Sequence, residues 1–449
     1  MNDQPARWRK DAPWTPIPPG CGRGRLPEPP VPTIDNLVSV FGRHLYVPDP
    51  EPVHVLASAV AANMLDGDPL WVMVVAPSSW GKTELIAPFV HTGYCHLLDD
   101  VSQAGLLSGG VRRRDGTSTG GLLAEFENYG GVPSGIIVIK DLSSVMASLD
   151  REDSGVMGAL RRVFDGEYVR RLGTNGGETF AWRGKAGLIA GVTEVVDFKM
   201  DLLDQMGSRF TFYRLADPAD RDGAAWAVHE RGPDVRAVRA ELAGAVRAFF
   251  GLRPPRQHCG APDPTTADRL VRLAGFVSVA RSGVYRDARG EVEAVPREEG
   301  SARLLGELEQ LYKGGLAVGL ADPWPMVAKV AFDSLARDKL RSLTEVARRP
   351  RPSTANIADN LGLPKARTGR HLDDLAAHGV IVRSTGSAGG DVWELSTWAA
   401  ERWHELAPKA PDQLVDVSLT AVGDPDVSTV PGDVEDDLEA EIDRLRQWD

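Results

Sequence analysis

Apolar residues along the chain follow two patterns of different period. Up to about residue 216, short apolar runs alternate with helical stretches, which predicts an α/β core with a mostly parallel sheet. After residue 217 apolar residues recur at i, i+3 and i+4, which predicts helices and no further strands before about residue 325. The expected strands are Trp71–Val75, Tyr94–Leu98, Ile136–Ile139, Ala186–Ala190 and Phe210–Leu215, and the expected helices are Val53–Leu65, Val235–Phe250, Thr265–Ser282 and Ala302–Val318.

These patterns divide the chain into five expected segments. Residues 1–33 contain nine prolines and predict an extended lead, and residues 34–216 form the α/β base. Residues 217–325 form an all-α lid, and residues 326–406 contain a basic helix, a short helix pair and a Gly-containing hairpin. Residues 407–449 form an acidic tail.

Composition limits the class of protein. No apolar run in the 449 residues approaches the ~18–20 residues of a membrane span, which excludes an integral membrane protein. The first residues, MNDQPARWRKDAPW, lack the apolar stretch of a secretory signal. The three cysteines lie far apart, so neither a disulfide framework nor a CxxC metal site is expected. We therefore expect a cytoplasmic protein with no membrane partner.

Charge is unevenly distributed around a net charge of −12. Residues 411–449 hold 12 acidic and 2 basic residues, whereas Arg337–Arg383 hold 10 basic and 5 acidic residues. Since nucleic-acid footprints are local, the overall acidity does not exclude a DNA partner. The acidic tail either keeps the protein soluble or competes with DNA for the basic segment.

A candidate phosphate-binding loop follows the first expected strand. The run is Ala76, Pro77, Ser78, Ser79, Trp80, Gly81, Lys82 and Thr83, and an apolar helical pattern comes next. Strand, loop, GKT and helix is the order of a P-loop, in which backbone N–H groups cradle phosphates. Lys82 would neutralise the β and γ phosphates, and Thr83 would ligate Mg²⁺. Ala76 stands where the motif has its first glycine. We expect ATP as substrate and Mg²⁺ as cofactor.

A second acidic site is expected where a later strand ends. Asp141 follows Ile136–Ile139 and Lys140, as the Walker-B carboxylate that holds Mg²⁺ would. The next position usually carries a glutamate that polarises water, but here it is Leu142. Either another carboxylate, Asp100 or Glu194, serves hydrolysis, or the protein binds nucleotide with slow or no turnover.

Further motifs follow in a fixed order. Residues 167–183 form a hairpin pattern around Asn175-Gly176, just before a strand that ends at Thr193. Arg209 then precedes Phe210 in the run Met-Gly-Ser-Arg-Phe, and Arg303 opens a later helix. Taken alone, Arg209 is either a group offered to a neighbouring subunit or a solvated arginine, and Arg303 could be an ordinary helix ion pair.

Over about residues 71–320, this order of motifs resembles the AAA+ ATPases with a hairpin before sensor 1, and in particular the motor module of minichromosome maintenance helicases and related prophage ATPases. The segment 104–115 resembles their helix-2 insert. The resemblance implies Thr193 as sensor 1, Arg209 as an arginine finger acting on a neighbouring subunit, and Arg303 as sensor 2. It also implies DNA contacts from Arg170, Arg171 and Asn175 on the hairpin. Thr193 replaces the usual asparagine, and no N-terminal DNA-binding tier precedes the core.

The basic segment near the C-terminus reads as helix, turn, helix and wing. Ser353 or Thr354 can cap the first helix, Gly362 can end it, and Ile357 and Leu361 can pack on Leu372 and Leu375. The pattern resembles a winged helix–turn–helix domain, whose second helix enters the DNA major groove. This arrangement leaves five residues of that helix facing solvent: Lys365, Arg367, Thr368, Arg370 and His371. We expect the first four to contact DNA, although such a unit can also dock proteins.

The expected function is that of an ATP-dependent, oligomeric, DNA-binding AAA+ ATPase. Such a protein would be a replication initiator, a helicase or a helicase loader of a phage or mobile element, with DNA, its own copies (for example as a hexamer) and a replicative helicase or other replication protein as partners. The alternative is a DNA-binding transcriptional regulator that is switched by nucleotide with little or no hydrolysis.

Overall fold

The computed structural model describes most of residues 32–407. The gaps are residues 108–120, 147–154, 172–178, 201–208, most of 217–233, 252–258 and 387–389, together with positions 48, 100, 101, 130, 144, 145 and 288. The proline-rich lead and the acidic tail, with the expectations attached to them, lie outside the described residues.

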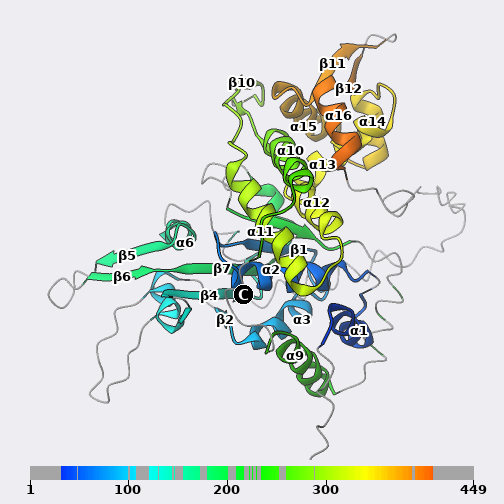
Figure 1. The fold of residues 1–449 in the computed structure, drawn as a ribbon. Coiled ribbons are helices and arrows are strands. Elements are labelled where there is room, and N and C mark those ends of the chain that lie inside the picture. Colours follow the sequence, from blue (N-terminus) through cyan, green and yellow to red (C-terminus); the bar gives the residue numbers. More distant parts are fainter. Residues whose placement is uncertain are drawn as a thin grey trace, which may run out of the picture.

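A six-stranded sheet lies at the centre of the fold (Figure 1). Its order is β2–β4–β7–β1–β8, all parallel, and β3 pairs antiparallel with the start of β4. The bounds are β1 Trp71–Val75, β2 Cys95–Leu97, β3 Glu127–Tyr129, β4 Val132–Ile139, β7 Lys185–Val192 and β8 Thr211–Arg214. The predicted α/β class with a mostly parallel sheet is confirmed, and β4 and β7 are longer than expected.

Helices cover both faces of the sheet, so its strands are buried on each side. Val72, Val74 and Val138 face a core shared with helices α2 (Glu51–Met64), α10 (Pro264–Arg281), α11 (Ala302–Val318) and α12 (Trp324–Asp333). Trp71, Met73 and Val75 face the other core, which includes α6 (Gly155–Phe164). Alternate residues of one strand therefore serve opposite cores.

The remaining elements flank this centre. They are α1 Ile34–His44, α3 Lys82–Ile86, η1 Ala87–Thr92, α4 Gln103–Leu106, η2 Leu122–Glu125, η3 Glu194–Phe198 and α9 Val235–Gly251. The apolar pattern after Thr83 does not form one continuous helix, because α3 is followed by the 3₁₀ turn η1 with Pro88 near its start. Proline has no N–H to continue the α-helical ladder.

The hairpin expected before β7 is present. Strands β5 (Glu167–Arg171) and β6 (Thr179–Arg183) pair antiparallel and form a two-stranded sheet of their own, which extends away from the central sheet (Figure 1). Tyr168 and Trp182 face each other in this register, and both are buried at the base of the hairpin. Its expected tip, including Asn175, lies outside the described residues.

The expectation of an all-α segment at 217–325 is wrong in one place. Strands β9 (Tyr285–Arg286) and β10 (Val292–Ala294) form a short hairpin between α10 and α11. Tyr285 and Val292 are exposed, so this hairpin buries no apolar face and leaves no periodic signal in the sequence.

Four helices and a hairpin form the C-terminal part of the fold. The elements are α13 Arg337–Arg348, α14 Thr354–Leu361, α15 Lys365–Ala377, β11 Ile381–Thr385, β12 Asp391–Leu395 and α16 Thr397–Leu406. As predicted, Ser353 caps α14 in a capping box, and Gly362 ends it with φ +62°. Ile357, Leu372 and Leu375 are buried together, so the expected helix pair is present with its core.

Helix α11 packs along α2 with its backbone very close (Figure 1). A Cβ added at Gly314 would lie 2.2 Å from the backbone oxygen of Ser58 and 2.9 Å from Ala62. A side chain at position 314 therefore has no room unless the two helices separate. None of the described helices is both long enough and apolar enough to cross a membrane.

We predict opposite effects for two alanine substitutions in α11. Gly314→Ala should lower the free energy of unfolding by about 1–3 kcal/mol, because it overpacks the contact with α2. Gly306→Ala on the same helix should raise it by about 0.4–1 kcal/mol, since a Cβ at 306 meets nothing within 4 Å and alanine restricts the unfolded chain. Urea denaturation followed by circular dichroism would measure both values. Equal effects of the two substitutions would contradict the observed packing.

Candidate functional site

The candidate phosphate-binding loop runs from the end of β1 to the start of α3. Ser79 and Gly81 both have positive φ, +66° and +76°, so the chain turns sharply before Lys82. Ser78, Ser79, Gly81 and Thr83 are exposed, whereas Lys82 is only 7% exposed. The Lys82 ammonium donates to the backbone oxygens of Ala76 and Pro77, at 2.7 Å each. These bonds hold the lysine inside its own loop.

Two carboxylates lie close enough to Lys82 to affect its charge. Burial lowers the pKa of Lys82, and the negative charges of Asp141 and Glu194 counteract part of that shift. Asp141, predicted as a Mg²⁺ ligand, and Glu194, predicted as one of two alternative carboxylates, therefore both lie within electrostatic range of Lys82. Asp100, the other acid considered from the sequence, lies outside the described residues.

A serine joins the ends of β4 and β7 at this edge of the sheet. One carboxylate oxygen of Asp141 accepts the N–H of Ser143 at 2.8 Å, and the Ser143 hydroxyl oxygen accepts the N–H of Thr193 at 2.9 Å. The N–H of Leu142 donates to the Gly191 oxygen at 2.7 Å. Asp141 and Thr193 are thereby held together, whereas Leu142 is fully buried. Sequence analysis missed Ser143, because a single serine after a strand carries no distinctive pattern.

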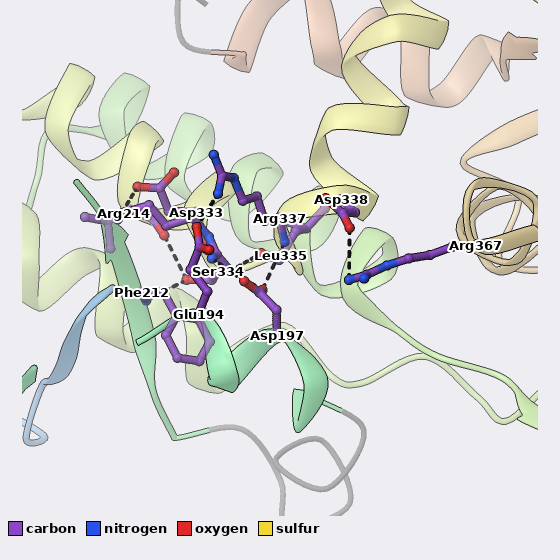
Figure 2. A network of polar contacts seen from close by, with 11 residues as sticks. Glu194, Asp197, Phe212, Arg214, Asp333, Ser334, Leu335, Arg337, Asp338 and Arg367 are labelled. Carbon is purple, nitrogen blue, oxygen red and sulfur yellow. Dashed lines mark hydrogen bonds and ion pairs between the residues drawn. The ribbon is translucent and has the colours of Figure 1, made fainter. Parts of the chain in front are cut away.

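The turn η3 follows Thr193 and contacts the C-terminal helices (Figure 2). Glu194 forms an ion pair with Arg337, the first residue of α13, and both side chains are 38% exposed. Asp197 accepts the N–H of Arg337 at 3.0 Å and both terminal nitrogens of Arg214 at 2.7 and 2.8 Å. Arg337 was counted only as part of the basic segment, and its contact with Glu194, 143 residues away, leaves no signal in sequence.

The two other predicted arginines gather elsewhere. Arg209 is 11% exposed and donates to both carboxylate oxygens of Asp165, each at 3.0 Å. Arg303 lies 3.7 Å from Glu299 in an i,i+4 ion pair. Both act on Glu307, whose burial raises its pKa to about 8 against the opposing charges of Arg281, Arg303 and Arg209. Arg209 and Arg303 are thus both near one buried carboxyl group, that of Glu307.

The residues predicted to contact DNA from the hairpin differ in exposure. Arg171 is exposed, whereas Arg170 is half-buried and donates to the backbone oxygen of Leu107 at 2.8 Å. Asn175 lies outside the described residues.

On helix α15 the structure corrects the predicted exposure of three residues, most strongly that of Thr368. Thr368 is fully buried, because it lies four and seven residues before Leu372 and Leu375 on the same apolar face. Lys365 and Arg370 are exposed as expected. His371, also expected to face solvent, is half-buried, and burial lowers its pKa.

The last basic residue of this set is engaged within the chain. Arg367 lies 2.9 Å from Asp338 of α13, and its guanidinium lies 5.1 Å from the ring centre of Phe198. It is therefore half-buried against α13 and η3 and does not simply face solvent.

Comparisons with known proteins give little support for an assignment. No protein-family model and no curated protein matches the chain. Two solved structures of the apo A form of the NrS-1 C-terminal region are similar to it, at 10% and 9% identity. They cover 81% and 80% of this chain and 75% of each other chain, with TM-scores of 0.25 and 0.22. At such low scores the likeness supports no conclusion about function.

We predict that the Arg214–Asp197 pair is important for stability. Arg214→Ala should lower the free energy of unfolding by about 3–5 kcal/mol, because Asp197 would keep a buried charge without its bidentate partner. Arg183→Ala removes an exposed pair with Glu167 and should cost no more than about 1 kcal/mol. Parallel urea titrations compare the two variants. A loss below 1 kcal/mol for Arg214→Ala would mean that the pair contributes little.

Proposed function

We propose that this protein is an AAA+ type P-loop ATPase that works on DNA as an oligomer, in the role of a replication initiator, helicase or helicase loader. The main support is the meeting of three chain segments at one edge of the sheet: the 76–83 loop after β1, Asp141 after β4 and Thr193 after β7. Carboxyl ends of parallel strands share one edge, which is where ligands bind in open α/β sheets.

The residues at this edge suit a nucleoside triphosphate with Mg²⁺. Asp141 and Thr83, both exposed, offer the carboxylate and hydroxyl oxygens that Mg²⁺ prefers, and the remaining ligands would come from phosphate and water. Among the described residues no group of three or more His, Cys, Asp or Glu side chains could hold a metal by itself. This agrees with an ion that binds together with its phosphate substrate. When bound, Mg²⁺ supplies positive charge to the phosphate oxygens.

The helices α13 to α15 and the hairpin β11–β12 support DNA binding. Their order and the shared core of α14 and α15 resemble a winged helix, with β11–β12 as the wing. Lys365 and Arg370 are exposed on the second helix of the pair and can reach phosphate or bases. The protruding β5–β6 hairpin offers Arg171 as a second contact. A replicative helicase or another replication protein is the protein partner that this role implies.

One observation favours the second candidate, a DNA-binding regulator that is switched by nucleotide without hydrolysis. Leu142, at the position after Asp141, is fully buried and cannot activate water. Multiple turnovers by the purified protein would exclude this candidate, whereas tight ATP binding without turnover would favour it.

We predict that Lys82→Ala weakens ATP binding at least about tenfold, because a buried ammonium that would pair with phosphate is lost. Phosphate release, with and without duplex DNA, should fall to background in the same variant. Titration with a fluorescent ATP analogue and a phosphate-release assay measure the two effects. Lys313→Ala is the matched control, since Lys313 lies on α11 and pairs only with Glu309 among the ion pairs described. The proposal fails if Lys82→Ala binds ATP as the wild type does.

We predict that Arg209 acts across a subunit boundary. In an oligomer it would leave Asp165 for a neighbouring phosphate, so Arg209→Ala should bind ATP normally and hydrolyse it about 10³-fold more slowly. Mixing Arg209→Ala with Lys82→Ala subunits should restore part of the activity, because some shared sites then hold an intact lysine and an intact arginine.

Mass photometry with and without ATP would show whether oligomers form. Arg236→Ala, at an exposed position on α9, is the control for Arg209→Ala and should hydrolyse ATP as the wild type does. A monomer under all conditions, or a mixture as inactive as its parts, would rule out a shared site.

A further inference from the structure

The first turn of helix α13 contacts two functionally different parts of the protein through consecutive residues (Figure 2). Arg337 forms an ion pair with Glu194, next to Thr193 at the end of β7. Asp338 lies 2.9 Å from Arg367 on α15, the helix that carries the exposed Lys365 and Arg370. One helical turn therefore joins the candidate phosphate site to the candidate DNA-binding helix.

The position of this turn is fixed by hydrogen bonds on its other side. Besides its bonds to Asp197, Arg214 donates to the backbone oxygens of Asp333 and Leu335, each at 2.9 Å. The Asp333 carboxylate in return accepts the N–H of Arg214 at 2.8 Å, and the Ser334 hydroxyl accepts the N–H of Phe212 at 3.1 Å. The junction between α12 and α13 is thus attached to β8, the neighbour of the β1 strand that precedes the loop.

Glu194 lies at the same edge of the sheet as the candidate phosphate-binding loop. Glu194 directly follows Thr193, and the N–H of Thr193 is linked to Asp141 through Ser143. The negative charge of Glu194 raises the pKa of Lys82 against the effect of burial. Leu142 leaves no carboxylate directly after Asp141. Glu194 is also part-exposed, so water can reach it.

The far end of η3 contacts α15 as well. Phe198, its last residue, is 70% exposed, and the Arg367 guanidinium lies over its ring. Arg367 thus rests on η3 and on α13 together. A ligand that draws Arg367 away removes a contact from both elements at once.

We propose that Glu194 is the catalytic base of ATP hydrolysis and that its ion pair with Arg337 restrains it, under control of α15 through Asp338. This rests on the proposed ATPase function. The water oxygen attacks the γ-phosphorus, the bond from that phosphorus to the β,γ-bridging oxygen breaks, and ADP keeps the electron pair. The water proton goes to Glu194, and the products are ADP and phosphate.

The ion pair with Arg337 determines when Glu194 can act. A carboxylate that is paired with a guanidinium points toward its partner, and it can take a proton only from a water within hydrogen-bond reach. When DNA engages Arg367, Asp338 keeps its pair with Arg341, 3.6 Å away on the same helix, the side chains of the first turn of α13 rearrange, and Glu194 is released from Arg337. DNA therefore accelerates hydrolysis, and by linkage ATP and DNA change each other's affinity by the same factor.

The catalytic part is tested by Glu194→Gln. This variant should bind the fluorescent ATP analogue within about twofold of wild type and hydrolyse ATP at least about 100-fold more slowly, with the loss in kcat. Glu293→Gln, on the exposed strand β10, carries the same chemical change away from the site and should behave as wild type. Equal hydrolysis by wild type and Glu194→Gln, including equal absence of hydrolysis, overturns the assignment.

The coupling part is tested by Asp338→Asn, with a fluorescein-labelled DNA duplex of mixed sequence. Wild type should hydrolyse ATP at least about fivefold faster with the duplex, and the two ligands should change each other's Kd by a similar factor. Asp338→Asn should lose most of this difference, while Asp359→Asn, an exposed acid on α14, should keep it. Arg337→Ala should lose the DNA dependence and Arg337→Lys should retain part of it. Undiminished coupling in Asp338→Asn and Arg337→Ala overturns the proposal.

These outcomes are distinct from a failure of the proposed function. If wild type and Lys82→Ala bind the ATP analogue alike, the ATPase proposal itself fails. If wild type binds and hydrolyses ATP but Glu194→Gln is unimpaired, only the present inference fails.

Discussion

The carboxylate of Asp197 is the interaction on which the arrangement of this protein most depends. It accepts two bonds from Arg214 of the sheet and one from the first N–H of α13, while its side chain is only 7% exposed. A buried charge of this kind is tolerated only with several well-placed donors. Those donors come from β8 and α13. The hydrogen bonds that Asp197 needs therefore also fix where the C-terminal helices begin relative to the strands.

Much of the fold could be predicted from sequence, and the reason lies in burial. Strands such as β1 are buried on both faces and therefore read as unbroken apolar runs, and the GKT turn between β1 and α3 stands out by itself. The start of β4 was missed because Pro133, Ser134 and Gly135 interrupt its apolar run. The β9–β10 hairpin was missed because its apolar side chains, Tyr285 and Val292, are exposed and join no core that would impose a period. The apolar face of α15 could have been found, since Thr368 shares its spacing with Leu372 and Leu375.

The candidate site was predictable only where a single segment carries the signal. Lys82, Thr83 and Asp141 belong to local patterns, and the structure holds Asp141 beside Thr193 through Ser143. The Glu194–Arg337 pair, by contrast, joins residues that are far apart in sequence and belong to different parts of the fold. Each looks like an ordinary surface charge until the chain is folded. Arg367 illustrates the same limit, because helical spacing places it near solvent and only tertiary structure supplies Asp338 and Phe198 as neighbours.

The close contact between α2 and α11 restricts how the protein can move. Where Gly314 meets Ser58, backbone touches backbone with no intervening side chains that could change rotamer and let the helices slide. Two helices packed in this way either keep their contact or come apart completely, because a close-packed interface does not deform gradually. Helices α2 and α11 must therefore travel as one rigid unit with the sheet. Any movement that opens or closes the phosphate edge has to arise outside this unit.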